Sequence, residues 1–201
     1  MDPGRSREAD GGGGRRVVVA PGRTGPPSSR LLTLLAGDLP GHRRKSGDDG
    51  RVRFVPVDGG LTLVLSSRIE KRFLGRTEVA VFEADLGLSM PEKSAIELRH
   101  TGRLRRTGLE AVVIEGGLPA RRVAGAMATD PELSQALLPL DFTRFELHGD
   151  PAGCIARVEL MGASHVAIAL PPIRSYVHLH RDQREAMLSG LEELRRVVAS
   201  A

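Results

Sequence analysis

The sequence predicts an α+β fold: an antiparallel sheet of several strands, a central helical segment, and a C-terminal helix packed on the sheet, preceded by a disordered N-terminal tail. Two observations near the C-terminus carry this prediction. Apolar and polar residues alternate in three segments, which is typical of half-buried strands: residues 155–161, 164–170 and 173–179. Residues 181–198 then change to the helical period, with Leu191 and Leu194 on one face. The change of period indicates a sheet whose buried face is covered by the last helix.

The first fifty residues differ in composition from the rest. Residues 1–27 are rich in glycine, proline and arginine and show no periodicity, so we expect a disordered tail. Residues 28–50 predict a short helix and a polar loop. Ser28 or Ser29 can cap the helix, which would contain Leu31 and Leu35, and the loop would occupy residues 41–50.

Residues 51–201 are predicted to form a single α+β domain. Strand patterns occupy residues 51–57, 61–66, 77–86, 95–104, 110–114 and 142–148. Asp58, Gly59 and Gly60 separate the first two and predict a hairpin turn, because glycine accepts the positive φ that such turns need.

The central helical segment is predicted in two pieces. Pro119 suits the first turn of a helix over residues 120–128. The run from Thr129 to Glu132 matches a capping box that starts a second helix, and Pro139 ends it. Strands followed by a helix thus occur twice, which leaves open a division into two units near residue 139.

Composition limits the classes of function. Among 201 residues there is one cysteine, Cys154, which agrees with a reducing compartment, and we expect a cytoplasmic protein with no membrane span. The net charge is +4, but aromatic residues make up only 3% and the C-terminal half is mildly acidic. The stacking surface typical of single-strand and RNA readers is therefore missing, which disfavours nucleic-acid binding by the folded core.

A histidine cluster suggests one candidate site. If residues 164–170 and 173–179 form a hairpin, His165 lies opposite His178, and His180 shares their face. Three imidazoles could bind a transition metal such as zinc, with Glu159 as an oxygen ligand, and so support a metal-dependent enzyme. However, Pro171 and Pro172 favour extended backbone, so the two segments could instead form one kinked strand that separates the histidines.

A basic run suggests a second candidate site. Arg99, Arg103 and Arg105 would line one face of a strand and could bind an anionic partner. The alternative is a solvated edge strand that is protected by charge and neutralised in part by Glu97.

These observations favour a non-enzymatic module that binds a ligand or another protein, without a cofactor. A curved sheet covered by a helix can leave a small apolar pocket, which Val158, Val166 and Ile168 could line. The metal-dependent enzyme remains the alternative, and no motif decides whether the protein is an enzyme.

Local strings give a resemblance. Residues 131–147, the run from Met161 to His165, and the run from Pro171 to Val177 resemble an uncharacterised bacterial family known only as a domain of unknown function. The likeness covers about residues 51–199. It implies no activity, substrate or cofactor.

Overall fold

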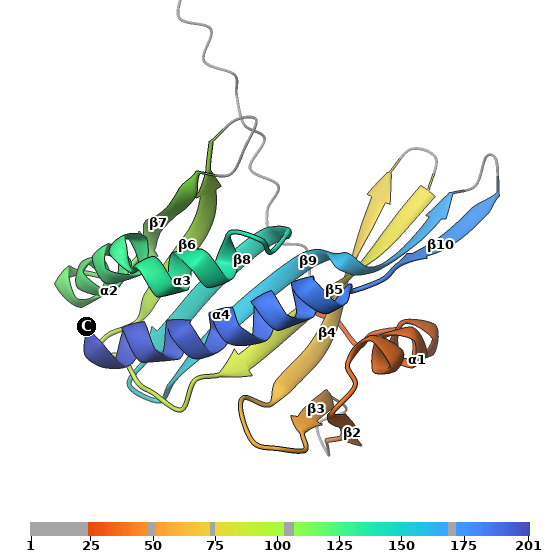
Figure 1. Ribbon diagram of the computed structural model, residues 1–201, viewed down its shortest axis with the longest axis horizontal. Helices are drawn as coiled ribbons and strands as arrows, with labels where there is room; N and C mark the ends of the chain where they lie inside the picture. Colours follow the sequence, from red (N-terminus) through yellow and green to blue (C-terminus); the bar gives the residue numbers. More distant parts are fainter. Residues whose placement is uncertain (1–23, 48–50, 73–74, 103–106, 169–171) are drawn as a thin grey trace, which may run out of the picture.

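The computed structural model describes residues 24–47, 51–72, 75–102, 107–168 and 172–201, which contain ten strands and four helices (Figure 1). The strands are β1 (Thr24–Gly25), β2 (His42–Ser46), β3 (Val52–Pro56), β4 (Leu63–Arg72), β5 (Gly75–Asp85), β6 (Ser94–Thr101), β7 (Gly108–Glu115), β8 (Phe142–Asp150), β9 (Gly153–Ile168) and β10 (Ile173–Val177). The helices are α1 (Ser29–Asp38), α2 (Leu118–Thr129), α3 (Pro131–Leu137) and α4 (Arg181–Ser200).

All described strands belong to one antiparallel sheet. The order is β2-β3-β4-β5-β9-β8-β6-β7, while β1 pairs with β4 and β10 pairs with β9. The late strands β8 and β9 lie between the early strands β5 and β6. Residues on both sides of position 139 therefore share one sheet.

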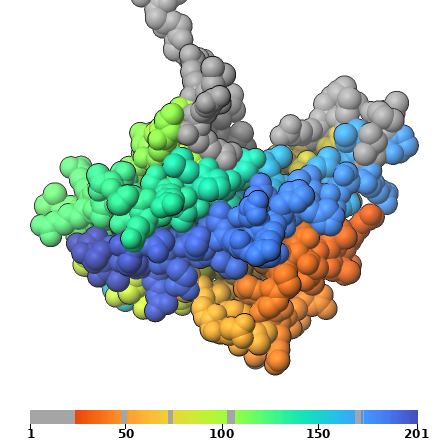
Figure 2. Space-filling model, in the orientation of Figure 1, coloured from red at the N-terminus to blue at the C-terminus, as the bar shows by residue number. Residues whose placement is uncertain are grey.

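Helix α4 runs across one face of the sheet, with α2 and α3 beside it (Figures 1 and 2). Leu191 and Leu194 of α4 are buried there, together with Phe82 and Phe145 of the sheet. Burying a side chain of this size stabilises the fold by roughly 1.5–3 kcal/mol. The predicted α+β fold, with an antiparallel sheet and a C-terminal helix on it, is confirmed.

Two predictions for the N-terminal part need correction. The loop predicted at residues 41–50 contains strand β2, which pairs with β3. Of the tail predicted at residues 1–27, residues 24 and 25 form β1, and residues 1–23 lie outside the described residues. Helix α1 begins as expected, because Ser28 Oγ accepts a hydrogen bond from Leu31 N at 3.2 Å.

Two further details differ from the sequence patterns. The strands predicted at 155–161 and 164–170 are one strand, β9, and its register against β5 shifts between Val79 and Val81. Ala163, inside that irregularity, has a φ of 63°. Helix α3 is capped by Asp130 and not by Thr129, since Asp130 Oδ1 accepts from Leu133 N at 2.8 Å.

Candidate anion-binding groove

The hairpins β4–β5 and β9–β10 extend beyond α4 at one end of the sheet (Figure 1). A row of basic residues crosses this end. The pairing aligns Lys71 with Arg76, Arg76 with Ala167, and Ala167 with Arg174. Residues directly opposite one another in antiparallel strands project from the same face. Three cations from three strands therefore share one face, which is the side of the sheet that carries the helices.

The small side chain of Ala167 leaves space between Arg76 and Arg174. An open groove of about 640 Å³ lies there, and Arg30 from the first turn of α1 also lines it. The remaining lining is Ser28, Lys71, Gly75, Glu78, His165 and Ile168. We refer to this space as the hairpin groove.

Glu78 is the one carboxylate among the lining residues, and it holds the start of α1. Its Oε1 accepts from the Ser28 backbone N–H and its Oε2 from the Ser28 hydroxyl, both at 2.7 Å. Because the hydroxyl also caps the helix, these bonds fix α1 beside the groove. The negative charge of Glu78 is thus engaged at the groove wall.

The four fixed cations of the groove are not neutralised in this way. Arg30, Lys71, Arg76 and Arg174 are exposed, and none has a carboxylate or hydrogen-bond partner among the side chains that the structure describes. Four positive charges therefore face one shared hollow with a single, engaged carboxylate. Such a site attracts anions by Coulomb forces and by guanidinium donors.

His165 of β9 lies within the groove, opposite Glu78 on one side and Tyr176 on the other. Its Nε2 is buried and has no hydrogen-bond partner among the described residues. Burial lowers the pKa of His165, and the charges of Arg30, Arg174 and Arg76 lower it further, while Glu78 acts in the opposite direction.

The structure separates the predicted histidine cluster. The hairpin forms, but His165 lies opposite Tyr176 and not opposite His178. His178 Nδ1 lies 3.0 Å from Asp38 Oδ1 at the end of α1, and exposed His180 precedes α4. In the described part of the chain, no three His, Cys, Asp or Glu side chains are placed to hold a metal ion.

Asp38 organises the region around His178. Its Oδ2 accepts from Tyr176 Oη at 2.7 Å and from Leu179 N at 2.9 Å, while Arg184 donates to its backbone carbonyl at 2.9 Å. These bonds tie the end of α1 to the junction between β10 and α4. Tyr176 and His178 therefore have a visible structural role here.

The predicted basic patch is only partly described. Arg99 Nη2 lies 2.6 Å from Glu97 Oε2 on the same strand, so this cation has its own carboxylate. Arg103 and Arg105 lie outside the described residues. The proposed apolar pocket does not form from its three residues: Val158 is buried in the core, Val166 alternates to the face opposite His165, and Ile168 lines the hairpin groove.

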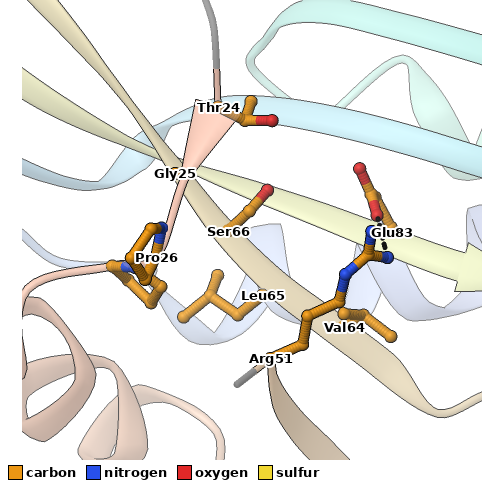
Figure 3. Close-up of a pocket in the computed structure, with 9 residues that line it drawn as sticks. Thr24, Gly25, Pro26, Arg51, Val64, Leu65, Ser66 and Glu83 are labelled. Carbon is orange, nitrogen blue, oxygen red and sulfur yellow. Dashed lines mark ion pairs between the residues drawn. The ribbon is translucent and has the colours of Figure 1, made fainter. Parts of the chain in front are cut away.

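A second cavity, of about 320 Å³, lies beside β4 between β1 and β3 (Figure 3). Arg51 and Glu83 both line it and form an ion pair, with Arg51 Nη1 3.8 Å from Glu83 Oε2 (Figure 3). Ser66 Oγ is buried beside it without a hydrogen-bond partner in the described part of the chain. One cation and one carboxylate offset each other there, so this cavity lacks the charge excess of the hairpin groove.

The groove cations were missed because they lie in four separate segments of the sequence. One local signal exists: Lys71 and Arg76 are placed symmetrically about the short connection between β4 and β5. Their alignment with Arg174 depends on the pairing of β5 with β9 and of β9 with β10, which bridges about ninety residues of sequence.

A family model described as "Protein of unknown function (DUF3156)" matches residues 37–198. The chain belongs to this family. The DUF3156 match includes Lys71, Arg76, His165 and Arg174, whereas Arg30 precedes it. Comparisons with curated proteins and with solved structures found no match. Within the described residues, no helix has both the length and the apolar character needed to cross a bilayer.

Proposed function

We propose that this protein is a non-enzymatic binding module whose hairpin groove takes an anionic ligand. The observation that carries the proposal is the set of four cations, Arg30, Lys71, Arg76 and Arg174, that share one hollow without carboxylate partners in the described chain. Like charges gathered in this way cost folding free energy, and a bound anion removes that cost.

The chemistry of the lining favours a phosphate group over a simple carboxylate. The guanidinium forks of Arg76 and Arg174 match carboxylate and phosphate oxygens alike, but four cations can offset the two charges of a phosphate dianion, whereas a carboxylate carries only one. The open side of the groove admits a ligand much larger than the group that is held. A phosphorylated metabolite and a phospholipid headgroup both carry this group.

We also place the protein in the cytoplasm. Cys154 is buried and free, and burial raises its pKa to about 11, with smaller contributions from Asp85 and Asp150. A thiol of this kind supports a protein that needs no oxidising compartment.

Calorimetric titration with inorganic phosphate and with pyrophosphate, at low ionic strength, tests the proposal. Charge-assisted hydrogen bonds contribute about 1.5–3 kcal/mol each, so Arg76→Gln and Arg174→Gln should each weaken binding by roughly tenfold to a hundredfold. Arg99→Gln is the matched control, because Arg99 is a sheet arginine that already has a carboxylate, and it should bind like the wild type. Equal affinity of all four proteins, or no binding by the wild type, would refute the proposal.

Vesicle sedimentation separates the two sources of phosphate. Vesicles of phosphatidylcholine with and without phosphatidic acid are mixed with the wild type and with Arg174→Gln. Arg174-dependent sedimentation with phosphatidic acid alone identifies a lipid headgroup. Binding of soluble pyrophosphate without sedimentation identifies a free phosphorylated compound.

A further inference from the structure

His165 occupies a position in the hairpin groove that the four cations alone do not explain. It lies on β9 two residues before Ala167, and therefore projects from the same face as Arg76 and Arg174. Its Nε2 is buried and lacks a hydrogen-bond partner among the described residues. Buried polar atoms without partners are uncommon in folded proteins and call for an explanation.

The groups facing His165 come from every neighbouring element. Arg30 approaches from α1, Arg76 from β5 and Arg174 from β10, and Lys71 lies further along the same face on β4. Glu78 is the opposing carboxylate, but it accepts both hydrogen bonds from Ser28. Tyr176, which lies opposite His165 on β10, donates a hydrogen bond from its hydroxyl to Asp38. Cations surround the imidazole, and none of the described residues accepts a hydrogen bond from Nε2.

A bound dianion changes both the charge around the imidazole and the lack of a hydrogen-bond acceptor. It offsets the charges of Arg30, Arg76 and Arg174, and it supplies an acceptor next to Nε2. The proton that the empty site disfavours on the imidazole is then favoured, because an opposite charge and a hydrogen bond both stabilise the protonated ring.

We infer that His165 donates a hydrogen bond to the anion in the hairpin groove and takes up one proton when the anion binds. This inference rests on the proposed function, since it concerns the same groove. By linkage, affinity for the anion rises as the pH falls, because protons and the anion bind together.

Sulfate is the probe for this inference, because it stays a dianion between about pH 5 and about pH 8. Phosphate itself titrates in this range and would mix its own protonation with that of the protein. We expect sulfate to bind the wild type about tenfold more tightly at pH 5 than at pH 8, which corresponds to a shift of one pKa unit in the linked group.

His165→Gln keeps a hydrogen-bonding side chain but cannot gain the charge. Its sulfate affinity should be the same at both pH values and close to the weaker wild-type value. His148→Gln is the matched control, since His148 lies on the opposite face of the sheet beside Glu146, and it should keep the wild-type pH dependence. Calorimetry near pH 7 in two buffers of different ionisation enthalpy should show proton uptake for the wild type and none for His165→Gln.

The outcomes separate this inference from the proposed function. Sulfate binding that is equally strong at both pH values, or equally pH-dependent in His165→Gln, overturns the role of His165 and leaves the anion site standing. Absence of sulfate binding at any pH overturns both. If His165→Gln does not fold, the imidazole proton resonances of the wild type decide: a His165 pKa that rises when sulfate is added supports the inference, and an unchanged pKa overturns it.

Discussion

The two faces of the sheet arrange their charged side chains in opposite ways. On the face away from α4, four arginines each have a carboxylate nearby: the N–O distances are 2.8 Å from Arg68 to Glu159, 2.6 Å from Arg99 to Glu97, 3.1 Å from Arg144 to Glu146 and 3.7 Å from Arg157 to Glu159. On the helix side, at the hairpin end, four cations share a groove with one engaged carboxylate. We call the first surface the paired face.

The difference in the placement of the charges distinguishes the hairpin groove from the paired face and supports the proposed anion site. On the paired face, Glu83 pairs with Arg157 and Arg157 with Glu146. Glu97 pairs with Glu146, but each of these two acids also has an arginine nearby. At the hairpin end, register sets a base beside a base, as where Lys71 pairs with Arg76. Like charges directly opposite one another destabilise a sheet, and Lys71 and Arg76 have no carboxylate partner among the described residues, which supports the proposal that an anion binds there.

The largest expected effect is at Glu159, a buried carboxylate of the paired face. The side chain of Glu159 is 1% exposed, and Arg68 donates to its Oε2 from Nε at 3.2 Å and from Nη2 at 2.8 Å. Glu159→Ala leaves this part-buried guanidinium without its main partner and should lower the free energy of unfolding by about 3 kcal/mol, measured by urea denaturation. The double variant Arg68→Met with Glu159→Leu should recover most of the loss, and a double variant as unstable as Glu159→Ala would contradict this account.

A smaller effect of opposite sign is expected in the groove. Arg174→Glu removes one cation from the set and places a carboxylate beside Arg76, so the free energy of unfolding should stay unchanged or rise by about 0.5 kcal/mol, while anion binding is lost. Urea denaturation of this variant in phosphate-free buffer measures the change. A loss of more than about 1 kcal/mol would show that the groove arginines stabilise the fold, and would remove the contrast between the two surfaces.

The sequence predicts the parts of the fold that depend on local patterns. Alternation of apolar and polar residues predicts most strands, and the helical period predicts α4, because both patterns are local. Strand β2 could not be predicted because Arg43, Arg44 and Lys45 show no alternation. Only its pairing with β3 identifies it as a strand. The sequence also did not predict that β9 is one continuous strand, since the irregularity around Ala163 breaks the alternation in the middle of the strand.

The candidate site depends on register even more than the fold does. The predicted hairpin of residues 164–179 forms, yet its pairing differs by two residues from the one that would set His165 against His178. That shift moves His178 to Asp38 and leaves His165 among the groove cations. The sequence contains the residues of both arrangements, and the register of β10 against β9 selects one of them, while the pairing of β9 with β5 brings Arg76 beside it.

The smallest expected effect is the pH dependence of stability that His165 produces in the ligand-free protein. Burial, together with Arg30 and its neighbours, lowers the pKa of His165 in the folded state below the unfolded value of about 6.5. The unfolded chain therefore binds the proton more readily, so the contribution of His165 is fully present above about pH 6.5 and is lost as the pH falls through the folded pKa.

Urea denaturation of the wild type and of His165→Gln at about pH 7.5 and about pH 5.5, in buffer free of phosphate and sulfate, measures this difference. The wild type should lose more stability than the variant on acidification, and added sulfate should reduce the excess loss, because the bound anion restores the favourable surroundings of the protonated ring. Equal losses of stability in the two proteins would show that the groove cations do not affect the protonation of His165. The proposed anion site would then consist of the four fixed cations alone.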